Sequence, residues 1–274
     1  MSDVSVGNLE TSIVRAVRAF RVSPEMLLTA ATIVALTLLW FTLARLKLVN
    51  PLFLPPPEDV WRAFVTVLTK GYQGSRLDQH LVASLSRILT GYVLACLVGI
   101  PLGLLMGLST KVKAVFDPMI EFYRPLPPLA LYTLLVMWLG IGDLSKVTLL
   151  FLAALPPLTI SAMQAARGID RQYVKAALCL GAGRRQLFRH VFVPACLPVI
   201  CTGMRISLGF TYTVLVAAEI VAATAGLGWM VWDASKFLLS DVVIMGLIVL
   251  GLTGLALDFL VRRAERALTP WRFQ

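Results

Sequence analysis

Four ionisable side chains stand within otherwise apolar stretches of this sequence: Arg87, Arg205, Glu219 and Asp258. A charge in an apolar environment is costly, and such residues normally face protein or water. Arg205 and Glu219 share one stretch, but a helix that rises about 1.5 Å per residue would hold them about 21 Å apart. Because they are too distant to pair on one straight helix, each needs a partner elsewhere. Two interpretations stay open: residues that line a polar path, and ion pairs with neighbouring helices.

The sequence lacks the motifs of common nucleotide-binding and hydrolytic sites. It contains no G-x-x-x-x-G-K-[ST] loop, so we do not expect the chain itself to bind ATP. The motifs H-E-x-x-H and G-x-S-x-G are also missing. Its two histidines, His80 and His190, are far apart in sequence, which disfavours a metal site with imidazole ligands. We therefore expect a non-catalytic chain that binds no cofactor and no metal.

A basic segment at residues 174–198, VKAALCLGAGRRQLFRHVFVPACLP, separates two long apolar stretches. Its first half has helical spacing, and Gly181 is suited to end that helix. Its second half places apolar residues on one side of a helix and arginines on another: Leu187, Phe188 and Val191 against Arg184, Arg185 and Arg189. Pro194 then suits the first turn of the next helix. Uncovered apolar faces rimmed by charge favour a docking surface, and the alternative is a helix pair that rests on anionic lipid.

The composition indicates a membrane protein, because 58% of the 274 residues are hydrophobic and only 15% are charged. A helix needs about 20 mainly apolar residues to cross the hydrocarbon. Six segments qualify: 26–45, 81–108, 126–141, 147–166, 194–222 and 242–261. The third is the least regular, since prolines crowd its start. The class predicted is an all-α integral membrane protein with six transmembrane helices.

Lysine and arginine set the orientation of such a chain, because they gather on the cytoplasmic side. With the N-terminus inside, fifteen of the 25 lie in cytoplasmic segments. Only six lie on the opposite side: Lys47, Arg62, Lys70, Arg76, Lys146 and Lys236. This predicts that both termini are cytoplasmic, and it explains the net charge of +10 without a nucleic-acid partner.

The same layout divides the chain into successive parts. We expect a cytoplasmic N-terminal segment at 1–25, the first transmembrane helix at 26–45, a periplasmic segment at 46–80, a five-helix core at 81–262 with a cytoplasmic loop at 167–193, and a cytoplasmic tail at 263–274. Within the periplasmic segment, PEDVWRAFVTVL has the spacing of a short amphipathic helix. In the second span, Gly99, Gly103 and Gly107 form a strip that favours close helix packing, with a pore-lining role as the alternative.

The basic segment resembles the cytoplasmic EAA loop of binding-protein-dependent ABC importer permeases, whose pattern is roughly E-A-A-x-x-x-G-A. Ala176, Ala177, Gly181 and Ala182 match in register, whereas Lys175 occupies the glutamate position. Further blocks are similar to the taurine, alkanesulfonate and nitrate branch, with taurine permeases nearest: PLFLPPP, LVASLSRILTGYVLACLVGIPLGLLMGLS, FDPMIEFYRPLPPLA, WLGIGDLSK, LVAAEIVAATAGLGWMV and LTPW. The resemblance covers residues 50–271 and departs locally at 132–134.

The resemblance implies a type I ABC importer permease of the bacterial inner membrane that works as a homodimer in the lipid bilayer. Its partners would be an ATPase dimer, which binds the ATP and Mg, and a periplasmic substrate-binding protein. The spans would move the substrate, taurine or a related small sulfonate, by alternating access. The alternatives are another small anion (alkanesulfonate, nitrate, bicarbonate or an aromatic acid), a stand-alone secondary transporter, and a membrane-embedded enzyme.

The resemblance also implies where the ATPase binds. The expected contact residues are Val174, Lys175, Ala176, Ala177, Leu178, Leu180, Gly181, Ala182, Arg184, Arg185, Leu187 and Phe188. Small residues would let a helix sit deep in a groove of the ATPase, and the two arginines could steer an acidic rim. Candidates for the substrate path are chosen by polarity alone: Glu121, Arg124, Thr211, Thr213 and Glu219.

Overall fold

A computed structural model describes residues 24–46 and 48–272, and within these ranges the ordered elements are helices. The chain divides into two compact units, Met1–Asp59 and Val60–Gln274, which are treated in turn. Most of the predicted N-terminal segment 1–25 lies outside the described residues, as do the last two residues of the predicted tail. The rest of that tail is mainly helical, because the last long helix extends to Leu268.

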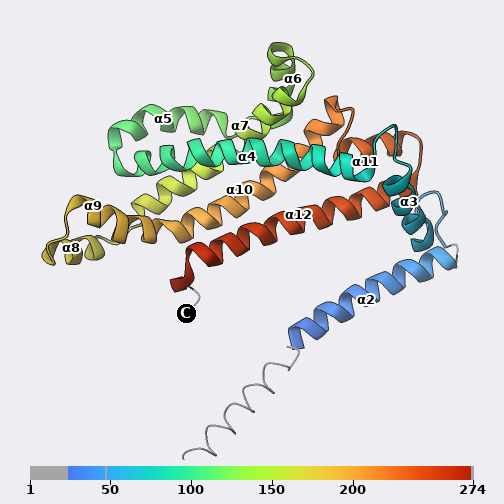
Figure 1. Cartoon of the computed structure of the whole chain (residues 1–274), viewed down its shortest axis with the longest axis horizontal. Helices are drawn as coiled ribbons and strands as arrows, with labels where there is room; N and C mark the ends of the chain where they lie inside the picture. The colour runs from blue at the N-terminus through green and yellow to red at the C-terminus, as the bar shows by residue number, and fades with distance from the viewer. Residues whose placement is uncertain (1–23, 47, 273–274) are drawn as a thin grey trace, which may run out of the picture. The chain divides into compact units, whose positions relative to one another are not determined.

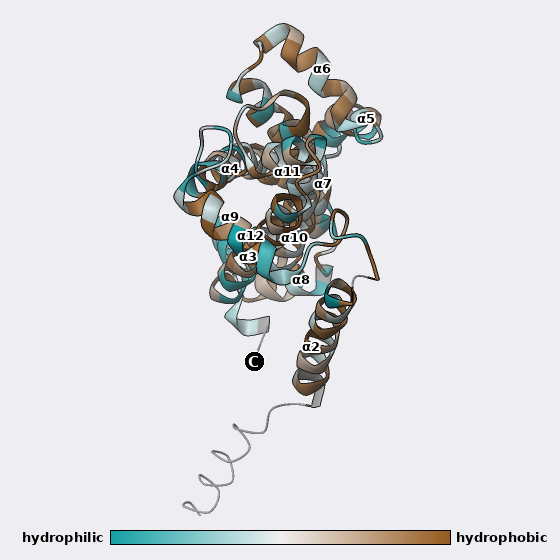
Figure 2. Cartoon of the chain, turned by 90° about the vertical axis from the view of Figure 1, so that its right-hand side faces the viewer, coloured by the Kyte–Doolittle hydropathy of each residue, from teal (hydrophilic) through white to brown (hydrophobic). Residues whose placement is uncertain are grey.

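The first unit is dominated by helix α2 (Pro24–Arg45), which confirms the first predicted span. Its apolar side chains are almost all exposed, and Figure 2 shows the helix brown over most of its length. The loop that follows is tied back to the helix, because Trp40 donates to the carbonyl of Pro55 at 3.2 Å. Arg45 pairs with Glu58 at 2.6 Å, in the first turn of helix α3 (Pro57–Thr69).

The second unit is a bundle of long helices with short ones at its ends (Figure 1). After α3 come α4 (Leu77–Leu108), α5 (Thr110–Tyr123), α6 (Pro128–Leu139), α7 (Asp143–Arg167), α8 (Arg171–Cys179), α9 (Arg184–Leu187), a π-helical turn (Phe188–Phe192), α10 (Val193–Ala222), α11 (Leu227–Lys236) and α12 (Ser240–Leu268). Helices α8 and α9 lie at one end of the bundle and α11 lies at the other (Figure 1). We refer to them as the α8 end and the α11 end.

Helices α4 and α7 run parallel and pack closely along the glycine strip. A Cβ at Gly99 would lie 3.1 Å from Oγ1 of Thr159, a tighter contact than Cβ atoms usually make. A Cβ at Gly103 would meet the Thr159 carbonyl, and one at Gly107 would meet Ala166. The strip is therefore a packing surface, as the first of the two interpretations predicted.

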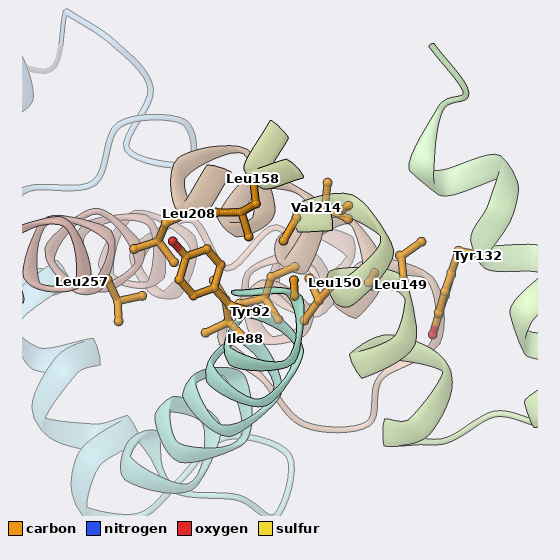
Figure 3. Close-up of a cluster of buried hydrophobic side chains, with 14 of the residues drawn as sticks. Ile88, Tyr92, Tyr132, Leu149, Leu150, Leu158, Leu208, Val214 and Leu257 are labelled. Atoms are coloured by element: carbon orange, nitrogen blue, oxygen red, sulfur yellow. The ribbon is translucent and has the colours of Figure 1, made fainter. Parts of the chain in front are cut away.

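The apolar core lies where α4, α7 and α10 meet (Figure 3). Ile88 and Tyr92 from α4 lie against Leu149, Leu150 and Leu158 from α7, with Leu208 and Val214 from α10, Tyr132 from α6 and Leu257 from α12 around them. The Tyr92 hydroxyl donates to the Met204 carbonyl at 2.6 Å, which satisfies its polar atom inside the core. This core fixes the helices that carry both ends of the bundle.

Five of the described helices are long and apolar enough to cross a membrane, against six predicted. They are α2, α4, α7, the helix that joins α9 to α10, and α12. The third predicted span, 126–141, is not a full-length helix: α6 has only 12 residues, and a break separates it from α5. The break has a physical cause, since Pro125, Pro127 and Pro128 each lack the N–H that would continue the helix.

Candidate functional site

The predicted helix–turn–helix exists and consists of α8, a short turn and α9. Gly181 ends α8 with a φ of +80°, a conformation that favours glycine. The Ala182 N–H donates to the Ala177 carbonyl at 3.0 Å, and the Gly181 N–H donates to the Leu178 carbonyl at 2.9 Å. These two bonds are those of a Schellman motif. The conformation of the turn is therefore defined by four of the predicted residues: Ala177, Leu178, Gly181 and Ala182.

Two capping residues of this turn escaped the sequence prediction. The Asp170 carboxylate accepts from the Gln172 N–H at 2.8 Å and so begins α8. The Gln186 side chain accepts from the Gly183 N–H at 3.0 Å at the start of α9. Aspartate before a helix and glutamine at its third position are recognised capping signals, so the sequence did carry the information.

The surface of the turn is uncovered in a single chain. Leu178, Leu180 and Phe188 are exposed, and Leu180 retains 88% of its accessible surface. Lys175, Ala176, Arg184 and Arg185 are also exposed, whereas Val174, Ala177, Ala182 and Leu187 are half-buried. The predicted residues thus include exposed apolar side chains as well as exposed cations.

The turn is joined rigidly to the bundle, because α9, the π-helical turn and α10 form one helix over Arg184–Ala222. Pro194 lies in the first turn of α10, as expected, and follows directly on the π-helical turn. Phe188 and Phe192 stack within this turn at 5.5 Å between ring centroids.

At the α11 end, the same helix closes a buried polar cluster around Glu219, which has no exposed surface. Its carboxylate accepts from Arg87 at 2.8 Å and from the Ser84 hydroxyl at 2.7 Å, both on α4. It also accepts from the Gly228 N–H at 2.8 Å at the start of α11. Arg87 continues the cluster to Asp143 on α7 at 2.7 Å. The cluster therefore connects four helices, α4, α7, α10 and α11.

An aromatic layer lies beside this cluster. His80 stacks on Trp229 at 5.8 Å, and its ring accepts from the Gly226 N–H at 3.1 Å. Tyr72 donates to Asp233 on α11 at 3.1 Å. Burial and this hydrogen bond raise the pKa of Tyr72 from 10.0 to about 12, so the phenol stays neutral and remains a donor.

Both charged residues of the fifth predicted span, Arg205 and Glu219, form ion pairs with other helices. Glu219 pairs with Arg87 on α4, and Arg205 pairs with Asp258 on α12 at 3.1 Å.

The other residues predicted to line the substrate path are dispersed in the structure. Thr211 is buried and donates to the Ser207 carbonyl, whereas Thr213 is exposed and donates to the Phe210 carbonyl. Glu121 and Arg124 are exposed near the break between α5 and α6.

Comparisons with known proteins agree on one family. Residues 99–270 match the family described as binding-protein-dependent transport system inner membrane component. The chain is 44% identical to the taurine transport system permease protein TauC of Escherichia coli, over 91% of each chain. It is 32% identical to the putative aliphatic sulfonates transport permease protein SsuC of Bacillus subtilis, over 90% of this chain and 87% of that one. It is 30% identical to the nitrate import permease protein NrtB of Synechocystis, over 92% of each.

A solved structure supports the fold independently. A chain of the inward-facing MetNI methionine ABC transporter superposes with a TM-score of 0.62 at 20% identity. The superposition covers 70% of this chain and 96% of that one. Since the family match spans more than half of the sequence, the protein belongs to the inner-membrane permease components of binding-protein-dependent ABC importers.

Proposed function

We propose that this chain is the permease subunit of an ATP-driven importer for taurine or a closely related small sulfonate. Support for the substrate comes from its likeness to TauC, which exceeds its likeness to the sulfonate and nitrate permeases described above. Two copies would form the path, and a binding protein would deliver the substrate at the α11 end. A separate ATPase dimer would bind ATP and Mg.

The parallel course of α4 and α7 supports six membrane crossings with both termini inside. Asp143 at the start of α7 pairs with Arg87 near the start of α4, while Ala166 near the end of α7 packs on Gly107 near the end of α4. The intervening residues must therefore return from the α8 end to the α11 end. Helices α5 and α6 together make that return, as a crossing broken in two. The excess of lysine and arginine supports a cytoplasmic position for the α8 end.

The observation that carries the mechanism is the uncovered turn between α8 and α9. Its Schellman geometry holds Leu178 and Leu180 outward, and Arg184 and Arg185 flank them. We propose that the ATPase binds this surface, the coupling loop (residues 174–188). Closure of the ATPase on ATP would then move α9 and the continuous α10. Lys175 occupies the position at which the EAA pattern has a glutamate, so the ATPase surface that contacts it would differ from a surface that binds a glutamate.

The test is ATP hydrolysis by the permease purified in lipid with its candidate ATPase, comparing wild type with Gly181→Asp. The variant puts a charge and a side chain at a positive φ, so we expect it to lose ATPase association or its stimulation by the taurine-loaded binding protein. Gly140→Asp is the matched control, because Gly140 also has a positive φ, +81°, with no atom near its Cβ position. If Gly181→Asp binds and responds as wild type does, the loop assignment is wrong.

A further inference from the structure

The break between α5 and α6 borders a pocket of about 270 Å³ at mid-depth of the bundle. Its walls are Tyr123, Arg124, Leu126 and Pro128 at the break, Ala153, Pro156 and Pro157 near the middle of α7, and Ile206 and Phe210 on α10. Irregular backbone at membrane depth is tolerated only where protein encloses it or where it lines a cavity. The volume lies just below the roughly 300–1,000 Å³ of sites for drug-sized ligands, so it suits a smaller molecule.

Two hydrogen-bond donors at the break have no partner in the described part of the chain. The hydroxyl of Tyr123 is buried and makes no hydrogen bond there. The guanidinium of Arg124, the next residue, forms no ion pair with any described carboxylate, including Glu121 one turn earlier. A buried hydroxyl without a partner is destabilising, and a guanidinium binds tetrahedral anions well because its donors are fixed in a fork.

The α7 part of the lining offers one acceptor. Residue 157 is a proline, so the carbonyl of Ala153 lacks the N–H that would normally bond it four residues later in α7. Ala153 lines the pocket, and the apolar rings of Pro156 and Phe210 lie beside it. The lining of the pocket therefore includes two donors, Tyr123 and Arg124, a residue of α7 whose carbonyl lacks its usual helical partner, and apolar surface.

We propose that this pocket is the site where the transported solute rests during its passage, and that it takes a short zwitterion with a sulfonate and a primary ammonium. The sulfonate binds Arg124 and Tyr123, and the ammonium donates to the Ala153 carbonyl. This inference rests on the proposed function. It adds the location of the site, and it gives a reason for the substrate class that is independent of the relatives' names.

The first experiment measures the solute's contact with Arg124 without any ATPase. The full-length permease in lipid nanodiscs is treated with phenylglyoxal, which modifies arginine, and modification is followed residue by residue by mass spectrometry. We expect taurine to slow modification of Arg124 several-fold and to leave Arg263, an exposed arginine of α12, unchanged. Ethylamine, which has no sulfonate, gives no protection. Equal rates at Arg124 with and without taurine would overturn the proposal.

The second experiment uses the assembled complex in proteoliposomes and measures radiolabelled taurine uptake together with ATP hydrolysis. Tyr123→Phe and Arg124→Gln should lower the taurine carried per ATP by about tenfold, the loss of one hydrogen bond to a charged group. The loaded binding protein should still stimulate hydrolysis, and Arg263→Gln should behave as wild type. Tyr123→Phe should not lower thermal stability, because the hydroxyl has no partner within the chain.

The two proposals fail in different ways. If the wild-type complex neither assembles nor hydrolyses ATP, the importer assignment is wrong. The protection assay still shows whether taurine binds in the pocket. If the complex works and both pocket variants carry wild-type amounts of taurine per ATP, the pocket is not on the path.

Discussion

The two ends of the long helix Arg184–Ala222 differ in how many partners this chain supplies for the side chains there. At the α11 end, Glu219 is fully buried and bonded by Arg87, Ser84 and Gly228. At the α8 end, Leu180 is almost entirely exposed and the neighbouring arginines have no described ion pair. One helix thus begins beside a surface that this chain leaves uncovered and ends in a cluster that this chain completes by itself. Substitutions at the two ends should therefore change different properties.

The largest effect is expected at Glu219. Glu219→Gln removes the charge that pairs with the buried guanidinium of Arg87, and breaking a buried ion pair costs about 3–5 kcal/mol. Unfolding of the purified chain in mild detergent, followed by denaturant titration, measures the loss. Glu121→Gln, the same change at an exposed position, should unfold as wild type does. Equal stability of the two variants would remove the contrast between the ends.

A smaller loss is expected in the α4–α7 contact that connects the two ends. Gly103→Ala would drive a methyl group into the Thr159 carbonyl, and overpacking of this kind costs about 1–3 kcal/mol. Gly209→Ala is the matched control, because no atom lies near its Cβ position. Replacing a helical glycine by alanine there should be neutral or stabilise by up to about 1 kcal/mol. The same denaturant titration distinguishes them, and an unchanged Gly103→Ala variant would mean that α4 and α7 separate easily.

At the α8 end, Leu180→Ser should leave stability unchanged, because its side chain is 88% exposed in the free chain. It should weaken ATPase binding about tenfold, equal to about 1.4 kcal/mol, as expected for an apolar contact that is buried only in the complex. Co-purification and a titration of the permease with the ATPase measure this affinity. A variant that lost stability but kept its affinity would reverse the assignment of this surface.

The smallest effect concerns the neutral phenol of Tyr72. Burial first, and the hydrogen bond to Asp233 second, raise its pKa in the folded chain from 10.0 to about 12, so the neutral phenol makes its full contribution to stability below pH 10. That contribution is lost as the pH rises through about 12. The unfolding temperatures of wild type and Tyr72→Phe should therefore converge as the pH rises from 10 to 12. A stability difference that grows with pH would contradict this sign.

Local chemistry allowed much of this structure to be predicted. Gly181 ends α8 because a glycine after helical spacing signals a turn, and the glycines of α4 pack on α7 because their spacing puts them on one face. The partners of Glu219 were not predictable from a single sequence. Arg87 lies 132 positions away, and no periodicity relates the two residues.

Two features that the sequence did not predict, helix α11 and the break in the third span, have physical causes. Helix α11 lies in a stretch too short and too mixed to resemble a span, and it is held in place by contacts from Glu219 and Tyr72. The third span was predicted as one helix because hydropathy averages over the prolines at residues 125–128. Those prolines stop the helix, and they create the pocket that contains Arg124.

The broken crossing also constrains how the protein is made. Helix α6 has 12 residues, fewer than the roughly 20 needed to cross the hydrocarbon, so its own hydropathy cannot hold it in the bilayer as it leaves the ribosome. Its described contacts are with α7 and α10, which are synthesised later. In the proposed six-crossing arrangement, α5 can pack on α4, which is already made, but we expect α6 to be stably inserted only after α7 has been translated. Insertion of the broken crossing would then be a cooperative event that extends over several helices.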